Sequence, residues 1–408
     1  MASILIVDDD PTIRIALQRN LCRLGYTVYL ATNGVTGLAK AQECLPDMIL
    51  CSAKMRDMDG LHFCQQVRAM PQLADTYFIL LTGKMSESSM VQAGWLLQKT
   101  TQHQSHISVD DFIAKYPTIQ EIDLESRVRC GITIQQAKNQ LKRQKEQFTQ
   151  QIYQASSYVK SLMPEDLAQG AVQIKTHFQP ANHLGGDGFN YLWLDQEHLL
   201  VYLLDVVGHG ILSSMVSVAV INWLNAHGDK DPAAILTALN QYFYDHLRGQ
   251  SGQNLYCTMW CGLFHLPSYQ LTYATAGHPP AVLLYREGDT SHLERLTTAS
   301  VPIGIKDTSS YSNTTCTIRQ GSHLCIFSDG IYEFTQQNKL PLGLDAFLAM
   351  ILATYSDQVS LVPSREQTAP SPYLTAAIMP KVTQLMANTH NLEDDISLIE
   401  LWFEPSSP

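Results

Sequence analysis

Residues 199–210 read LLVYLLDVVGHG, an apolar run that ends at Asp205 and passes into a turn between two glycines. Six consecutive apolar residues are typical of a buried strand, and the glycines predict a sharp change of direction directly after it. An aspartate at this point stands at the edge of a sheet, where its carboxylate can reach a bound ligand. Other aspartates in the same setting would identify a site.

Three further segments repeat this arrangement. Asp187 follows Gly185-Gly186, Asp329 follows the apolar run 323–328 and precedes Gly330, and Asp394-Asp395 open the strand-like run 394–403. Carboxylates gathered at one sheet edge repel one another unless a cation neutralises them. Oxygen ligands favour hard ions such as Mg²⁺ or Mn²⁺, and two such ions can activate water for in-line displacement at phosphorus. Because each Asp-Gly pair alone is more often an ordinary turn, the prediction depends on all four positions together.

The sequence around these aspartates predicts an α+β domain over residues 166–405, with much antiparallel sheet. Apolar runs typical of strands occur at 199–204, 255–264, 271–275, 281–285, 323–327 and 396–402, and helical patterns occur at 211–226, 231–247 and 344–354. Residues 356–372 are mostly polar and contain prolines, which predicts a loop.

Six strings in this region resemble the PPM, or type 2C, protein phosphatases, in their bacterial SpoIIE/RsbU-like branch. They are LGGDGFNYLWLD (184–195), DVVGHG (205–210), AGHPP (276–280), PIGI (302–305), FSDGIYEF (327–334) and DDISLIEL (394–401). The resemblance covers nearly all of residues 165–403 in the family order. It implies a β-sandwich flanked by helices, a binuclear Mn²⁺ or Mg²⁺ site, and hydrolysis of phosphoserine and phosphothreonine without a covalent enzyme intermediate.

The same resemblance implies which residues form the site. Asp205 would bridge the two ions, and the backbone carbonyl of Val206 would add a ligand. The aspartates that would serve as catalytic residues and metal ligands are Asp187, Asp205, Asp329 and Asp394.

Other positions in these strings are open to more than one interpretation. His209 could donate a proton to the leaving oxygen, or it could be structural in its glycine-flanked turn. His278, in AGHPP, is expected to be structural. Asn190 stands where many relatives have aspartate and Val207 where they have serine, but neither side chain is expected to bind metal. The arginine that holds phosphate in eukaryotic members has no clear counterpart, so the metals are expected to hold most of the substrate phosphate.

Residues 1–120 alternate short apolar runs with helical patterns, which predicts a parallel α/β sheet with helices on both faces. This region resembles a flavodoxin-like two-component receiver domain. Its expected acidic pair is Asp8 and Asp9, its switch hydroxyl is Thr82, and its lysine is Lys115. The third strand departs from the pattern, because Ser52 occupies the position of the phosphoacceptor aspartate.

The serine changes what this domain is expected to do. Acyl-phosphate chemistry requires a carboxylate nucleophile beside Mg²⁺, so Ser52 predicts no ordinary phosphotransfer. A protein-binding or dimerising module is the leading interpretation. The alternatives are that Ser52 is itself a kinase target, or that the fold is a relic retained for stability.

Residues 121–165 predict a helical linker between the two domains. Apolar residues recur at 134, 141, 148, 155 and 162, and again at 152 and 159, in a heptad stripe interrupted by Lys145. The stripe predicts either a homodimer through the 121–163 helix or a single amphipathic helix on its own domain. The expected protein is therefore multidomain, with an α/β receiver domain (1–120), a possible coiled-coil linker (121–165) and an α+β phosphatase domain (166–405).

Composition narrows the possible partners. The 408 residues carry a net charge of −11, which argues against a nucleic-acid partner. There is neither an apolar run long enough to span a membrane nor an N-terminal signal-peptide pattern. Nine scattered cysteines without a CxxC pair predict free thiols in a reducing cytoplasm and no zinc site.

These observations predict a phosphatase that acts on a phosphorylated partner protein, and the resemblance favours a STAS-type anti-anti-sigma factor as that substrate. Regulation would pass from the receiver-like domain through the linker helix to a switch element near 208–226. One alternative is a catalytically inert signalling scaffold, which the four intact aspartates argue against. Another is a metal-dependent phosphoester hydrolase with a small-molecule substrate.

Overall fold

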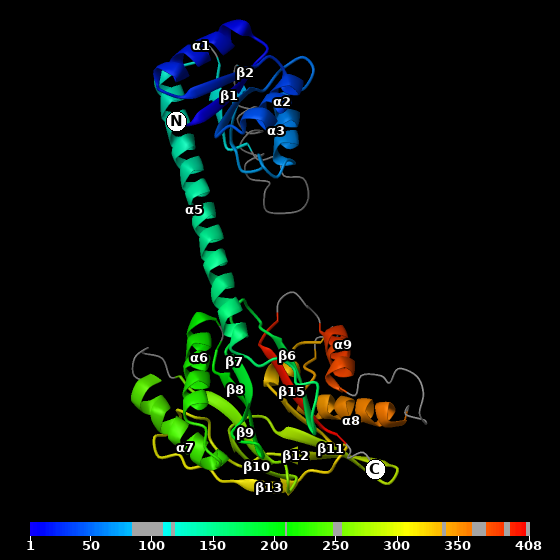
Figure 1. Cartoon of the computed structure of the whole chain (residues 1–408). Helices are drawn as coiled ribbons and strands as arrows, with labels where there is room; N and C mark the ends of the chain where they lie inside the picture. Colours follow the sequence, from blue (N-terminus) through cyan, green and yellow to red (C-terminus); the bar gives the residue numbers. More distant parts are fainter. Residues whose placement is uncertain are drawn as a thin grey trace. The chain divides into compact units, whose positions relative to one another are not determined.

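The structure, a computed structural model, describes residues 1–83, 109–115, 119–208, 210–247, 255–336, 340–360, 373–386 and 392–404. The chain divides into two compact units, Met1–Phe148 and Thr149–Pro408 (Figure 1). The three-part division expected from the sequence stays a proposal, because the units divide within the linker helix. Residues 97–108, which are polar in sequence, lie outside the described residues.

The first unit is built on one parallel sheet in the order β2-β1-β3-β4-β5. The strands are β1 (Ser3–Val7), β2 (Thr27–Ala31), β3 (Met48–Ser52), β4 (Tyr77–Thr82) and β5 (Asp111–Ala114). All five residues of β3 are buried, as expected for the central strand of a sheet covered on both faces. The α/β receiver fold expected from the sequence is confirmed.

Among the described residues, three helices connect strands β1 to β4, and each begins at a side-chain cap. They are α1 (Pro11–Arg23), α2 (Gly34–Cys44) and α3 (Gly60–Arg68), capped by Asp10, Asn33 and Asp59. Asn33 and Thr36 form a reciprocal capping box, which satisfies backbone N–H groups that the first helical turn leaves unpaired.

The helices cover both faces of this sheet. Helix α1 and the start of α5 (Glu121–Ser161) pack on one face, where Leu17, Leu124 and Val128 are buried with residues of β1 and β3. Helices α2 and α3 pack on the other face, around Phe63 and Phe78 (Figure 1).

The predicted linker helix is present as α5, which ends before Pro164. Its middle part carries apolar side chains that face solvent in this single chain. Leu141 is 68% exposed and Phe148 is 55% exposed, and both belong to the heptad stripe. A soluble helix seldom leaves such a stripe uncovered, so this surface is available to a partner.

The second unit is a sandwich of two antiparallel five-stranded sheets. One sheet has the order β13-β10-β9-β8-β7, and the other has the order β12-β11-β14-β15-β6. The strands of the first sheet are β7 (Asp187–Trp193), β8 (His198–Val206), β9 (Cys257–His265), β10 (Gln270–Ala276) and β13 (Thr314–Thr317). Those of the second sheet are β6 (Val172–Gln179), β11 (Ala281–Glu287), β12 (Thr290–Leu296), β14 (His323–Phe327) and β15 (Ile396–Phe403).

Helices cover both outer faces of the sandwich (Figure 1). Helices α6 (Ile211–Ala226) and α7 (Pro232–Tyr242) pack on the first sheet, and α7 continues into a π-helical turn, η2 (Phe243–Leu247). Helices α8 (Leu344–Ser360) and α9 (Thr375–Leu385) pack on the second sheet. The aromatic residues Trp260, Phe264 and Phe403 fill the core between the sheets. The expected sandwich flanked by helices is confirmed.

Two helix predictions need correction. Helix α8 continues to Ser360, although the polar composition from residue 356 onward predicts a loop. Helix α9 was missed, because Pro380 stands inside it and proline normally argues against a helix interior. Both helices bury apolar side chains against the sheet, and this packing outweighs their local sequence preferences.

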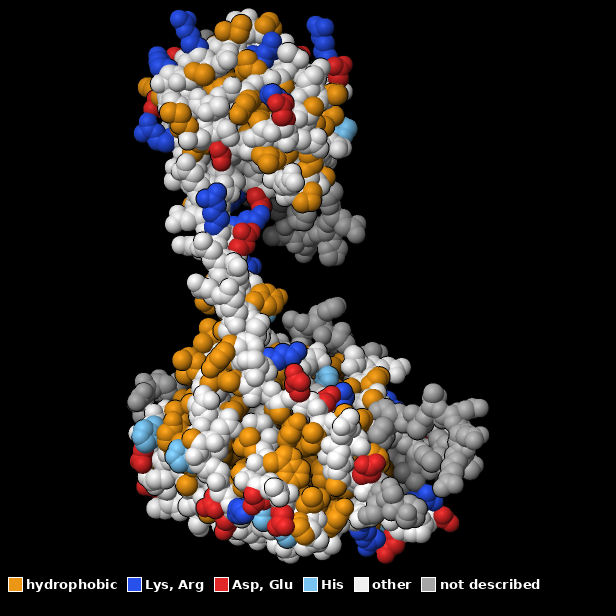
Figure 2. Space-filling view, viewed as in Figure 1, with side chains coloured by type: hydrophobic (Ala, Val, Ile, Leu, Met, Phe, Trp, Pro, Cys, Tyr) orange, Lys and Arg blue, Asp and Glu red, His pale blue; other side chains and the backbone are white. Residues whose placement is uncertain are grey.

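Charged residues of both signs are interspersed on the molecular face drawn in Figure 2, without a continuous basic patch among its described residues. Within the part of the chain that the structure describes, no helix combines the length and the apolar character needed to cross a membrane.

Candidate active site

The centre of the candidate site is the strand pair β7 and β8, on which Asp187 and Asp205 lie directly opposite each other. Asp187 is the first residue of β7, and its side chain is buried. The chain approaches this point over Gly186, where a Cβ atom would stand 2.6 Å from the carbonyl oxygen of Val206. Glycine is therefore required for the backbone to pass this close to the end of β8.

Asp187 is also tied to the opposite sheet. Ser397 Oγ, on β15, donates a hydrogen bond of 2.6 Å to Oδ2 of Asp187. The backbone N–H of Ser397 donates in turn to Oγ of Ser328, directly after β14, at 3.0 Å. The site consequently joins the two sheets at one end of the sandwich.

Asp329 and Asp394 reach this same end from β14 and β15. Asp329 begins the short turn η3 (Asp329–Ile331) after β14, and Asp394 shortly precedes β15. The two strands are antiparallel neighbours, so the end of one meets the start of the other. Gly330 makes the approach possible, because a Cβ atom there would lie 2.1 Å from the backbone oxygen of Asp395.

The charges of these carboxylates act on one another. Burial raises the pKa of Asp205 to about 8, and neighbouring carboxylates add to the increase. These neighbours are Asp329, Asp394 and Asp395. Burial and the charges of Asp205 and Asp395 also hold the pKa of Asp187 well above its usual value. The four aspartates singled out in the sequence thus belong to one electrostatic cluster.

The chemistry of this cluster suits a hard divalent cation. Every side-chain donor is a carboxylate oxygen, and the backbone carbonyl of Val206 lies against the same glycine turn. Among the described residues, no three His, Cys, Asp or Glu side chains already stand in an arrangement that encloses a metal ion. The assignment of Asp187, Asp205, Val206, Asp329 and Asp394 as ligands therefore stays a prediction, supported by donor type and mutual repulsion.

Sequence reasoning missed the role of Asp395. Its side chain is 2% exposed and accepts hydrogen bonds from three backbone N–H groups. In the sequence, Asp394 and Asp395 are equivalent candidates, and only Asp394 was assigned to the site. The structure distinguishes them, because only the Asp395 side chain accepts these three backbone hydrogen bonds from the 181–187 loop.

Of the two candidate histidines, only His278 lies within the described residues. His209 lies outside the described residues, so its suggested role as a proton donor is untested. His278 is buried, with Nδ1 at 2.9 Å from the carbonyl oxygen of Pro279. Burial lowers the pKa of His278 to about 4, which keeps the ring neutral and agrees with a structural role.

The first unit holds the predicted receiver pocket. Nζ of Lys115 donates to Oδ2 of Asp8 and to Oγ of Ser52, both at 2.7 Å. Asp8 and Ser52 are buried, whereas Asp9 is exposed at the strand end. Oγ1 of Thr82 is buried without a hydrogen-bond partner among the described residues. The structure thus brings Asp8, Ser52 and Lys115 into direct contact.

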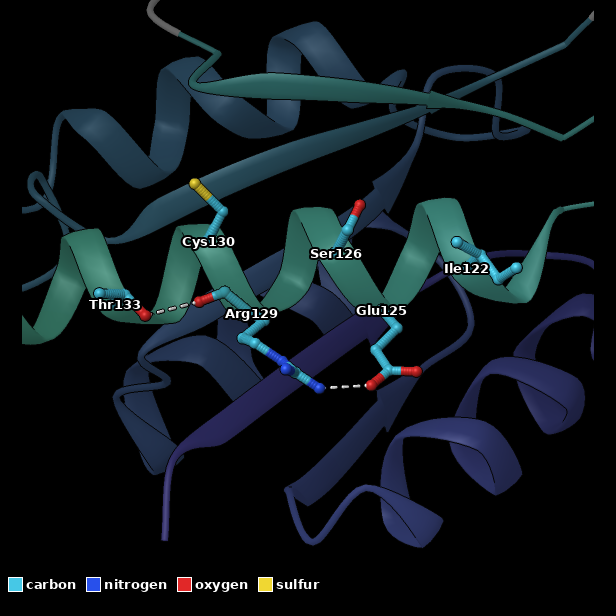
Figure 3. A pocket seen from close by; sticks show the side chains of 6 residues that line it. All are labelled: Ile122, Glu125, Ser126, Arg129, Cys130 and Thr133. Carbon is cyan, nitrogen blue, oxygen red and sulfur yellow. Dashed lines mark hydrogen bonds and ion pairs between the residues drawn. The ribbon is translucent and has the colours of Figure 1, made fainter.

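A shallow hollow on α5 lies apart from these residues. Its lining comes from one side of that helix: Ile122, Glu125, Ser126, Arg129, Cys130 and Thr133. Figure 3 shows the ion pair between Glu125 and Arg129 and the bond from Thr133 Oγ1 to the Arg129 carbonyl. None of the predicted site residues contributes to it.

Two family descriptions match the chain. Stage II sporulation protein E (SpoIIE) matches residues 195–403, about half of the chain, and the response regulator receiver domain matches residues 4–122.

Among curated proteins, phosphoserine phosphatase RsbP of Bacillus subtilis is 24% identical over 178 residues, which are 43% of this chain and 43% of RsbP. Phosphoserine phosphatase RsbU of the same organism is 24% identical over 282 residues, which are 65% of this chain and 81% of RsbU. This chain therefore spans less than half of RsbP and most of RsbU.

The fold of the second unit is also found in a solved structure, the SiaA-PP2C domain of Pseudomonas aeruginosa. The TM-score is 0.51 at 20% identity, over 64% of this chain and 98% of that one. Taken with the sandwich and its carboxylate cluster, these matches show that the chain belongs to the SpoIIE family of PPM-type, metal-dependent protein phosphatases, with a receiver domain in its N-terminal part.

Proposed function

We propose that the protein hydrolyses phosphoserine or phosphothreonine in a partner protein, with Mn²⁺ or Mg²⁺ at the carboxylate cluster. The observation that carries this proposal is the in-register pair of the buried Asp187 and the half-buried Asp205, whose carboxylates lie among further acidic side chains that repel them. A fold does not normally keep such repulsion in a buried place unless a cation relieves it.

The groups that would hold the cations are Asp187, Asp205, the carbonyl of Val206, Asp329 and Asp394. Bound ions would neutralise phosphate charge and activate water for in-line attack. The surrounding residues of the protein hold these ligand groups in position. Ser397 orients Asp187 by its 2.6 Å hydrogen bond, and the strand register sets the spacing between Asp187 and Asp205.

The named activities of the relatives support the proposed substrate class. RsbP and RsbU are both named phosphoserine phosphatases, which supports a phosphoprotein over a small phosphoester. We propose a STAS-type regulator as the partner. None of the nine cysteines forms a disulfide, which agrees with the proposed cytoplasmic location.

We propose that the receiver domain regulates the phosphatase without ordinary phosphotransfer, since Ser52 replaces the acceptor carboxylate. The route would run through α5, paired with α5 of a second copy, to the switch element near 208–226. Two contacts in the second unit support this route. The ring centroids of Tyr153 on α5 and His183 lie 4.4 Å apart, and Oγ of Ser214 on α6 donates to the carbonyl of Gly185.

A substrate panel tests the proposed activity. The full chain is assayed with Mn²⁺ on a phosphoserine protein, a phosphothreonine peptide and a set of nucleotides. Manganese-dependent release of phosphate from the protein and peptide supports the proposal. Preference for nucleotides would favour a small-molecule hydrolase, and no hydrolysis of any substrate would favour an inert scaffold.

A further inference from the structure

Asp395 occupies an unusual position for a buried carboxylate. Its two oxygens face three backbone N–H groups of one loop, those of Ala181, Gly186 and Asp187. Oδ1 accepts from Ala181 at 2.7 Å, and Oδ2 accepts from Gly186 at 2.5 Å and from Asp187 at 3.3 Å. These bonds join the start of β15 to a loop more than two hundred residues earlier in the chain.

Two glycines allow the backbone to approach Asp395 closely. A Cβ atom on Gly185 would stand 2.4 Å from Oδ2 of Asp395, and one on Gly330 would stand 2.1 Å from its backbone oxygen. Oγ of Ser328 donates to that same backbone oxygen at 3.2 Å. The Asp395 side chain is therefore fixed from several directions, and the loop has little freedom to shift relative to it.

The loop that Asp395 holds ends at Asp187. We propose that Asp395 is a positioning residue that clamps the 181–187 loop and so fixes Asp187 at the cation site. This inference rests on the proposed function, because it takes Asp187 as a ligand. Asp395 itself is assigned no contact with substrate or metal.

The clamp requires a carboxylate for a geometric reason. Each oxygen of Asp395 accepts from a different part of the loop, and an ionised carboxylate has acceptors on both sides. In Asp395→Asn, the amide NH₂ would face a backbone N–H, so one side of the clamp would be lost at nearly unchanged size. Outer-shell changes of this kind typically weaken metal binding by about 10- to 100-fold.

The test compares the full wild-type chain with Asp395→Asn and Gly185→Ala, and uses Glu393→Gln as the control. Glu393 is exposed two residues away, and its substitution makes the same chemical change. Gly185→Ala displaces the carboxylate but keeps its charge. The rate of amide hydrogen exchange in the 180–187 peptide is measured without metal. Mn²⁺ binding is measured by calorimetry, and kcat and KM for p-nitrophenyl phosphate are measured over a series of Mn²⁺ concentrations.

We expect faster amide hydrogen exchange of this peptide in the two clamp variants, Asp395→Asn and Gly185→Ala. The Mn²⁺ concentration that gives half of the maximal activity should rise about tenfold or more in both. At saturating Mn²⁺, Asp395→Asn should regain most of the wild-type kcat, and Glu393→Gln should match wild type throughout. Wild-type exchange in both clamp variants would overturn the proposal, as would an unchanged Mn²⁺ requirement. If wild type hydrolyses no phosphoester, exchange and calorimetry still decide the clamp, so the two failures remain distinct.

Discussion

Asp187 and Asp205 are paired residue for residue across β7 and β8, at the end of the sandwich where β14 and β15 bring further carboxylates. The pairing sets the buried side chain of Asp187 against the half-buried side chain of Asp205. Burial, together with the charges of the surrounding carboxylates, raises the pKa values of both residues, and this crowding of acidic groups is the reason to expect cations here.

The metal-free protein should become less stable as the pH rises. The folded-state pKa of Asp205, about 8, is above the usual aspartate value, so the neutral acid is the form that the fold favours. Its stabilising contribution is present below pH 4 and is lost as the pH rises toward 8. In EDTA, the melting temperature of the second unit should therefore fall over this range, and less so in Asp205→Asn. Equal slopes in the two proteins would contradict the prediction.

The titration of His278 should make the folded protein more stable as the pH rises, which is opposite in sign to the effect of Asp205. Its folded-state pKa is about 4, against an ordinary value of 6.5, so the folded protein resists its protonation. The contribution of the neutral ring is complete above pH 6.5 and is lost as the pH falls toward 4, by at most about 3 kcal/mol. Urea unfolding at several pH values should show this loss in wild type but not in His278→Asn, whose amide can still donate to the Pro279 carbonyl. An identical pH profile in both proteins would exclude a titrating His278.

The receiver pocket should accept phosphoryl groups once a carboxylate is restored. Ser52 Oγ lies 2.7 Å from Nζ of Lys115, so Ser52→Asp would place an acid beside the lysine. With Mg²⁺ and acetyl phosphate, the variant should gain the mass of one phosphoryl group, and wild type should not. Ser52→Asn, with the same shape and no charge, is the control. Phosphorylation of wild type under these conditions would contradict the account of this domain.

Helix pairing should depend on the exposed heptad residues of α5. Leu141→Lys combined with Phe148→Lys places charges on the apolar stripe, and sedimentation should then detect a shift from dimer to monomer. Gln140→Lys with Gln144→Lys adds the same charge at neighbouring exposed positions and should leave the dimer intact. A wild-type chain that is monomeric at all concentrations would reject pairing through α5.

Local signals in the sequence were sufficient for the parallel sheet of the first unit, whereas the sandwich of the second unit was expected from the family resemblance, and its strands β6, β7, β12 and β13 were not predicted. Buried strands such as β3 and β8 are continuous apolar runs, and the caps Asp10, Asn33 and Asp59 stand where helices begin. Helix α9 was not predictable in this way, since only its packing against the second sheet compensates for Pro380.

The candidate site was predictable at the level of residue type and less so in detail. Four aspartates at strand ends were sufficient to place the cluster, because antiparallel neighbours bring such ends together. The distinct roles of Asp394 and Asp395 depend on the bonds that Asp395 accepts from the 181–187 loop, more than two hundred residues earlier in the chain. Ser397 gave no signal at all, because its importance comes from one contact with Asp187 across the two sheets.

The most direct test of the central claim is manganese-dependent hydrolysis of a phosphoserine protein by wild type and by Asp205→Ala, each titrated with Mn²⁺ and checked for folding by circular dichroism. We expect wild type to release phosphate only with added metal, and a folded Asp205→Ala to lose activity by at least about 100-fold at every Mn²⁺ concentration. Equal rates for the two proteins, or full activity of wild type in EDTA, would contradict a cation site built around Asp187 and Asp205.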